Sequence, residues 1–103
     1  MIEKVRNWVN GVSKDDNNAV FRIRQFVLQK FPLARKRSVA DSDNLLESGI
    51  IDSLGVLELV TFFQQEFSVA AADEDLIPEN FQNIECMAKF VERSLELQLG
   101  AAE

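Results

Sequence analysis

The chain reads Asp43-Asn44-Leu45-Leu46-Glu47-Ser48-Gly49-Ile50-Ile51-Asp52-Ser53-Leu54 immediately before its clearest helical pattern. Apolar residues then recur every three to four positions, which predicts a helix from Leu54 to Phe67 whose inward face holds Leu57, Val60, Phe63 and Phe67. Asp52 and Ser53 stand where side-chain oxygens cap a helix N-terminus. The unpaired backbone N–H groups and the positive dipole end there also favour a phosphate.

The same periodicity predicts further helices, whereas strand alternation is almost absent. One helix runs from Ala19 to Phe31 and is ended by Pro32. The last runs from Ile84 to Leu99, with Gly100 beyond its end. A short helical turn covers Pro78–Phe81, because proline fits a first helical position. The N-cap candidates of the first helix are Asp16, Asn17 and Asn18, and the side chains expected to face the core are Ile23, Phe26, Val27, Phe31, Ile84, Met87 or Ala88, Val91 and Leu95.

The connection from Pro32 to Asp52 is long for a compact domain, where structureless loops of that length are uncommon. Gly49 permits a turn within it. We expect the loop to be ordered and tied onto the helices by Leu45, Leu46, Ile50 and Ile51. Ordered long loops usually carry a function, which directs attention to the end of this one.

Length and composition limit the possible functions. A chain of 103 residues is one domain, and no apolar run reaches the roughly 18 residues of a membrane span. The single cysteine excludes an internal disulfide. The absence of histidine excludes the commonest general base and most zinc-site patterns. Residues 1–40 hold nine basic and three acidic side chains, and residues 41–103 hold two and fourteen. We expect a cytoplasmic monomer that binds neither nucleic acid nor membrane, and a partner with a basic face.

The stretch around Ser53 resembles the acyl carrier and peptidyl carrier protein family, in which a serine within Asp-Ser-Leu carries 4′-phosphopantetheine. The upstream Leu-Leu-x-Ser-Gly-Ile-Ile, the helix that follows, and the segment from Asp73 to Ile84 stand in the family's order over about residues 19–95. The resemblance implies an all-α four-helix bundle of three principal helices and one short helix. The carrier domain is then 18–99, with an N-terminal extension over 1–17 and a tail over 100–103. Spacing of Ile2, Val5, Trp8 or Val9, and Val12 makes a short helix plausible in the extension.

The function that this resemblance implies is a carrier and not an enzyme. A separate phosphopantetheinyl transferase would attach the group to Ser53 from coenzyme A, and the arm would hold an acyl or aminoacyl group as a thioester. A loading ligase or transferase and later enzymes would be the partners. The residues expected to contact them are Asp52, Leu54, Val56, Glu58, Thr61 and Gln65.

Three residues depart from the fatty-acid carriers of the family. Gly55 stands where those carriers often have an acid, and Gln64 and Gln65 replace common glutamates. These differences favour a specialised pathway over fatty-acid synthesis. A D-alanyl-type amino-acid carrier is the alternative within the class. An unmodified helical interaction protein, in which Asp52 and Ser53 only cap a helix, is the alternative from another class.

Overall fold

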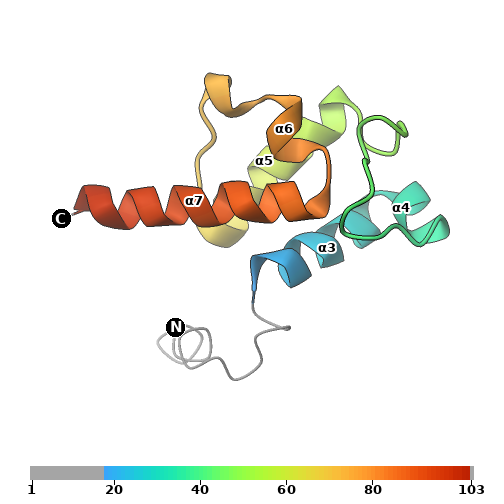
Figure 1. The fold of residues 1–103 in the computed structure, drawn as a ribbon, viewed down its shortest axis with the longest axis horizontal. Coiled ribbons are helices and arrows are strands. Elements are labelled where there is room, and N and C mark those ends of the chain that lie inside the picture. The colour runs from blue at the N-terminus through green and yellow to red at the C-terminus, as the bar shows by residue number, and fades with distance from the viewer. Residues whose placement is uncertain (1–17, 103) are drawn as a thin grey trace.

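The computed structural model describes residues 18–102, and every regular element in this part of the chain is helical (Figure 1). The predicted all-α fold and its three principal helices are confirmed. The elements are α3 (Ala19–Lys30), α4 (Pro32–Lys36), α5 (Ser53–Phe67), the 3₁₀ turn η1 (Asp73–Asp75), α6 (Pro78–Phe81) and α7 (Ile84–Ala102). The helix that was predicted for the extension lies outside the described residues.

None of the helices between residues 18 and 102 is long and apolar enough to cross a membrane.

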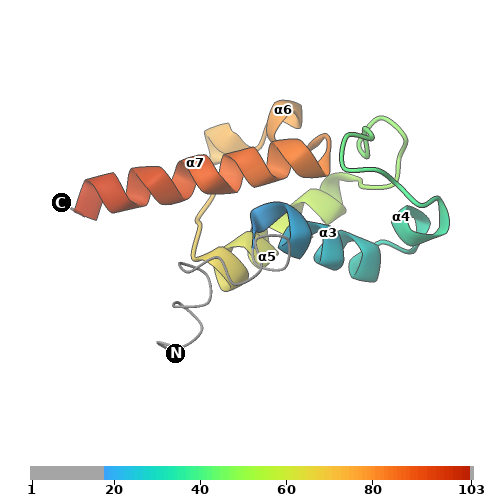
Figure 2. The same cartoon turned by 60° about the horizontal axis from the view of Figure 1, so that its bottom comes forward.

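Helices α3 and α5 lie side by side beneath the long α7, and α6 packs against the first half of α7 (Figure 2). The rings of Phe26 in α3 and Phe62 in α5 stack with their centroids 4.2 Å apart. The segment 37–52 closes the end of the bundle where α4, the start of α5 and the start of α7 meet (Figure 1). Ser53, the first residue of α5, therefore lies on the surface at the end of the bundle that this segment covers.

The boundaries of α3 follow from its capping residues. The side chain of Asn18 accepts a hydrogen bond from the Phe21 N–H at 2.8 Å, as one of the predicted caps. Phe31 is extended, since a residue before proline avoids the helical region, and Pro32 then starts α4. The prediction of an unbroken loop from Pro32 to Asp52 was wrong, because proline permits a new helix after ending the previous one. Buried Ala34 holds α4 on the core.

The predicted inward face of α5 was wrong at Leu57, which is 54% exposed. The residues of this helix that are buried are Gly55, Leu59, Phe63 and Phe67, and Val60 packs partly against the core. Apolar residues occur on almost every side of α5, so three- and four-residue spacing fit the sequence equally well. The packing at Gly55 fixes the choice, because a Cβ atom there would lie 2.9 Å from side-chain atoms of Ile51 and Phe31.

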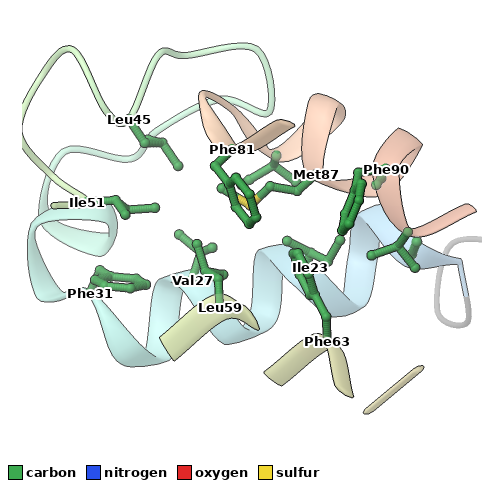
Figure 3. Packing of buried hydrophobic residues seen from close by; sticks show 14 of the residues in the cluster. Ile23, Val27, Phe31, Leu45, Ile51, Leu59, Phe63, Phe81, Met87 and Phe90 are labelled. Carbon is green, nitrogen blue, oxygen red and sulfur yellow. The ribbon is translucent and has the colours of Figure 1, made fainter. Parts of the chain in front are cut away.

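The core joins the loop to all three long helices. Figure 3 shows Leu45 and Ile51 pointing from the loop toward Val27 and Leu59. Phe63 lies at the other end of this cluster, with its ring 6.0 Å from that of Phe81 and 6.1 Å from that of Phe90. The residues predicted to be inward in α3 and α7 are buried, except that Phe26 and Leu95 are partly buried.

Helix α7 continues through Gly100 to Ala102, beyond the predicted end at Leu99. A glycine ends a helix when it takes a left-handed conformation, but within a helix it costs only about 1 kcal/mol relative to alanine. Ala101 and Ala102 have the strongest helix preference and extend the last turn.

Candidate functional site

Ser53 is the first residue of α5, and its side chain is exposed. The preceding Asp52 has an extended backbone and is the N-cap, as its carboxylate accepts a hydrogen bond from the Gly55 N–H at 2.9 Å. No acidic side chain lies within the first turn of α5. Apart from the capping carboxylate of Asp52, no acid at the positive end of the helix dipole opposes an anion carried on the Ser53 oxygen.

A groove of about 610 Å³ opens beside Ser53, and we call it the Ser53 groove. The loop contributes one wall, α5 a second, and the segment from η1 to α6 a third. Its lining side chains, apart from those of Asp52 and Ser53, are almost all apolar. The lining residues are Leu46, Gly49, Ile51, Asp52, Ser53, Val56, Leu57, Leu76, Ile77, Pro78 and Phe81. An exposed hydroxyl beside an apolar groove suits a long prosthetic arm that bears an organic group.

Backbone hydrogen bonds hold the loop wall of the Ser53 groove in place. The Leu45 N–H donates to the carbonyl of Gln82 at 2.7 Å, which ties the loop to the turn before α7. The Ile51 N–H donates to the carbonyl of Leu45 at 3.0 Å and closes the loop on itself. Gly49 has a φ of 80°, as expected for the turn residue between them. Ser53 is thus presented by a fixed segment.

Gly55 faces the interior and not the surface. A Cβ atom at this position would lie 2.9 Å from the Cγ2 of Ile51 and 2.9 Å from the Cε1 of Phe31. An acid at this position, as fatty-acid carriers often have, would meet the side chains of Ile51 and Phe31 in this fold, so Gly55 does not represent a charge lost from the surface. The glycine instead lets the start of α5 approach the loop and the end of α3 closely.

The six side chains predicted to contact partners lie on two faces of the molecule. Asp52 and Val56 line the Ser53 groove, and Leu54 beside them is 71% exposed. The other three line a second hollow, of about 240 Å³, between α3 and α5. These three are Glu58, Thr61 and Gln65.

On the second face, the polar side chains of Glu58 and Thr61 both have partners within the protein. The carboxylate of Glu58 lies 3.8 Å from the ammonium of Lys30, and both side chains are about half exposed. The hydroxyl of Thr61 donates to the carbonyl of Leu57 at 3.2 Å, within its own helix. Glu58 and Thr61 do not line the Ser53 groove, whereas Asp52 and Val56 do. No common pocket therefore supports the prediction that all of these residues contact the same partners.

Sequence reasoning missed three apolar side chains at the Ser53 groove. Leu57, Leu76 and Ile77 are 54%, 38% and 43% exposed and line its rim. The signal for Leu76 and Ile77 was a pair of apolar residues directly before Pro78, on a short turn that cannot bury both. Leu57 was misassigned to the core.

Among residues 18–102, no cluster of histidine, cysteine, aspartate or glutamate side chains is placed to hold a metal ion.

Comparison with known proteins identifies the class of protein to which the chain belongs. Residues 22–91 match the family model for the phosphopantetheine attachment site. The chain is also 35% identical, over 49 residues, to a probable acyl carrier protein, PigG, of Serratia sp. (strain ATCC 39006). That match covers 48% of this chain and 56% of the relative, so the chain spans little more than half of that protein.

The class of protein is that of the phosphopantetheine-dependent carriers. Since the family model covers more than half of the chain, the protein belongs to the phosphopantetheine attachment family, and its expected resemblance to this family is confirmed. Its cofactor is 4′-phosphopantetheine, attached covalently. The exposed hydroxyl at a helix start and the apolar groove beside it fit such a group.

Proposed function

We propose that Ser53 is the attachment residue and that the chain holds an acyl or aminoacyl intermediate in a specialised biosynthetic pathway. The observation that carries this proposal is the position of Ser53, exposed as the first residue of α5 and on the wall of the 610 Å³ groove. The nearest serine in sequence, Ser48, is a poor rival. Its hydroxyl donates to the carbonyl of Leu45 at 3.3 Å, and it does not start a helix.

Attachment requires a base and a donor from outside the chain. The Ser53 oxygen would bond to the phosphorus of coenzyme A that carries the pantetheine arm. The phosphoanhydride bond then breaks, 3′,5′-ADP leaves, and the hydroxyl proton passes to a base of the transferase. The chain contains no histidine, so its own part is to present the hydroxyl. Asp52 assists by fixing the first turn of α5 through its bond to the Gly55 N–H.

When attached, the group supplies a thiol on which the cargo is held as a thioester. The leucine, isoleucine, valine and phenylalanine side chains of the Ser53 groove favour an apolar acyl cargo, since burial of apolar surface is favourable at about 25 cal/mol per Å². The name of the Serratia relative, a probable acyl carrier protein, supports a carrier of acyl groups in general. The exposed Leu54 and Leu57 next to Ser53 offer partner enzymes an apolar contact.

The charges on α5 support a specialised pathway. Its two carboxylates, Glu58 and Glu66, form ion pairs with Lys30 and Arg22 of α3. Gln64 and Gln65 are exposed but uncharged. The helix therefore presents little free negative charge to the basic surface of a fatty-synthase enzyme. A dedicated adenylating ligase is the loading enzyme that we favour.

The proposal is tested by modification in vitro. The chain is incubated with coenzyme A, magnesium and a broad-specificity phosphopantetheinyl transferase, and its intact mass is measured. We expect a single addition in the wild type and in the matched control Ser48→Ala, and none in Ser53→Ala. Modification that persists in Ser53→Ala places the group on another residue. A wild type left unmodified by several active transferases would instead favour the helical interaction protein.

A further inference from the structure

A second groove runs along the outer surface of the bundle between α3 and α5, and we call it the α3–α5 groove. It consists of two adjoining hollows of about 380 and 240 Å³ that share Phe26 and Phe62. From α3 it is lined by Phe21, Arg22, Gln25, Phe26, Gln29 and Lys30. From α5 it is lined by Glu58, Thr61, Phe62, Gln65 and Glu66.

The floor of the α3–α5 groove is aromatic and its edges are charge-balanced. The Phe26 and Phe62 rings are stacked at an interplanar angle of 15° and remain partly exposed. Lys30 pairs with Glu58 across one hollow, and Arg22 pairs with Glu66 across the other. An occupant that suits this groove has an apolar stripe for the floor and little net charge.

We propose that residues 2–12 of the extension bind in the α3–α5 groove as a helix antiparallel to α3. These residues have an apolar stripe with helical spacing, made of Ile2, Val5, Trp8 or Val9, and Val12. Residues 2–12 also carry a net charge of only +1, because Lys4 and Arg6 outnumber Glu3 by one. Both properties match those of the groove.

The length of the segment agrees with this placement. Helix α3 has 12 residues, and at 1.5 Å per residue it is about 18 Å long. A helix over 2–12 would be about 17 Å long. Residues 13–17 then form the connection to the N-cap Asn18, within the roughly 2–8 residues usual between packed helices. The segment can therefore fold back along the groove from Phe21 to Lys30.

Binding of the extension has a consequence that rests on the proposed function. The α3–α5 groove contains Glu58, Thr61 and Gln65, three of the side chains predicted to contact partners. A docked extension covers them and leaves the Ser53 groove open. Partner enzymes would then approach Ser53 from the α6 side.

The position of Trp8 makes the proposal testable, since the chain has one tryptophan. In the full chain we expect Trp8 emission to be shifted to the blue of free N-acetyltryptophanamide and to be protected from acrylamide. The double variant Val5→Asp/Val9→Asp should shift the emission to the red and raise the quenching constant several-fold, because charged groups cannot lie on the aromatic floor. The matched control Leu33→Asp adds an acid at an exposed leucine of α4, outside the groove, and should leave both unchanged.

A second measurement locates the binding surface. Amide chemical shifts should change between the wild type and Val5→Asp/Val9→Asp at Gln25, Gln29 and Gln65, and not at the rim of the Ser53 groove. Exposed Trp8 in the wild type, or shift changes on another face, would overturn the proposal. A blue shift that disappears on dilution would also overturn it, because a second copy would then supply the extension. Ser53→Ala should give the wild-type spectrum, so this test stands apart from that of the attachment residue.

Discussion

The two grooves border opposite sides of one helix but are built in different ways. The Ser53 groove needs three separated segments: the loop, α5 and the turn from η1 to α6. The α3–α5 groove needs only two neighbouring helices and has an aromatic floor between ion pairs. The comparison indicates that the path of the loop creates the groove beside Ser53, whereas the packing of two helices alone creates the α3–α5 groove. Helix α5 divides the molecule into these two faces.

The largest expected effect comes from comparing two leucines of α5, Leu57 at the rim of the Ser53 groove and Leu59 in the core behind both grooves. Leu59 is 0% exposed and Leu57 is 54% exposed. Leu59→Ala should lower the free energy of unfolding by about 2–5 kcal/mol, as for other buried leucines. Leu57→Ala should stay within about 0.5 kcal/mol of the wild type, as for other surface changes. Denaturant melts followed by circular dichroism measure both, and equal losses would contradict the assignment of the buried face.

Much of this fold could be predicted from the sequence, because caps and prolines mark helix boundaries locally. The structure begins α3, α5 and α6 where the sequence predicted, at Asn18, Asp52 and Pro78. The inward face of α5 could not be predicted reliably, since apolar residues occur on almost every side of this helix. Which face of α5 is buried depends on the tight packing at Gly55. This packing involves Ile51 of the loop and Phe31 at the end of α3, which lie outside α5. Helix α4 was missed because Pro32 was used as an end and not also as a beginning.

Deletion of residues 1–17 tests whether the α3–α5 groove has an occupant. If the apolar stripe of the extension binds there, its loss should lower the free energy of unfolding by about 2–3 kcal/mol. The remaining chain should still fold and be modified, since the family match begins at residue 22. Denaturant midpoints of the two chains give the difference. Equal midpoints would argue against docking, and a truncated chain without a cooperative transition would show that the extension is part of the fold.

A smaller effect is expected at Asp52, which borders the Ser53 groove and caps α5. Asp52→Ala should cost about 1 kcal/mol of stability, because the Gly55 N–H loses its acceptor. Asp52→Asn keeps an acceptor oxygen and should stay close to the wild type in stability. Comparing transferase rates on both variants then separates two roles. A slow but stable Asp52→Asn protein indicates contact with the transferase, whereas a wild-type rate leaves Asp52 as a cap only.

The candidate site was predictable in part for the same physical reason. Ser53 stands in a local motif, and its position at a helix start follows from neighbouring residues. The groove beside it could not be predicted, since Leu46, Leu57 and Ile77 come together only through the path of the loop. The split of the partner residues likewise depends on where α3 lies. Glu58 and Gln65 face that helix, and no pattern within α5 indicates it.

The smallest expected effect concerns the charge on α5 and the choice of pathway. Gln64 and Gln65 are exposed, and the two carboxylates of the helix are paired with α3. A fatty-synthase transacylase should therefore transfer malonyl groups poorly to the modified chain. Gln64→Glu/Gln65→Glu should improve this transfer by at most about ten-fold, because each exposed ion pair contributes roughly 0.2–1 kcal/mol. The improvement should shrink at higher salt, since screening weakens exposed pairs. The control Ser42→Glu/Ala70→Glu adds the same charge at exposed positions outside both grooves and should have a smaller effect. If the wild type already accepts malonyl groups as fast as a fatty-acid carrier at low and moderate salt, the specialised pathway loses its support.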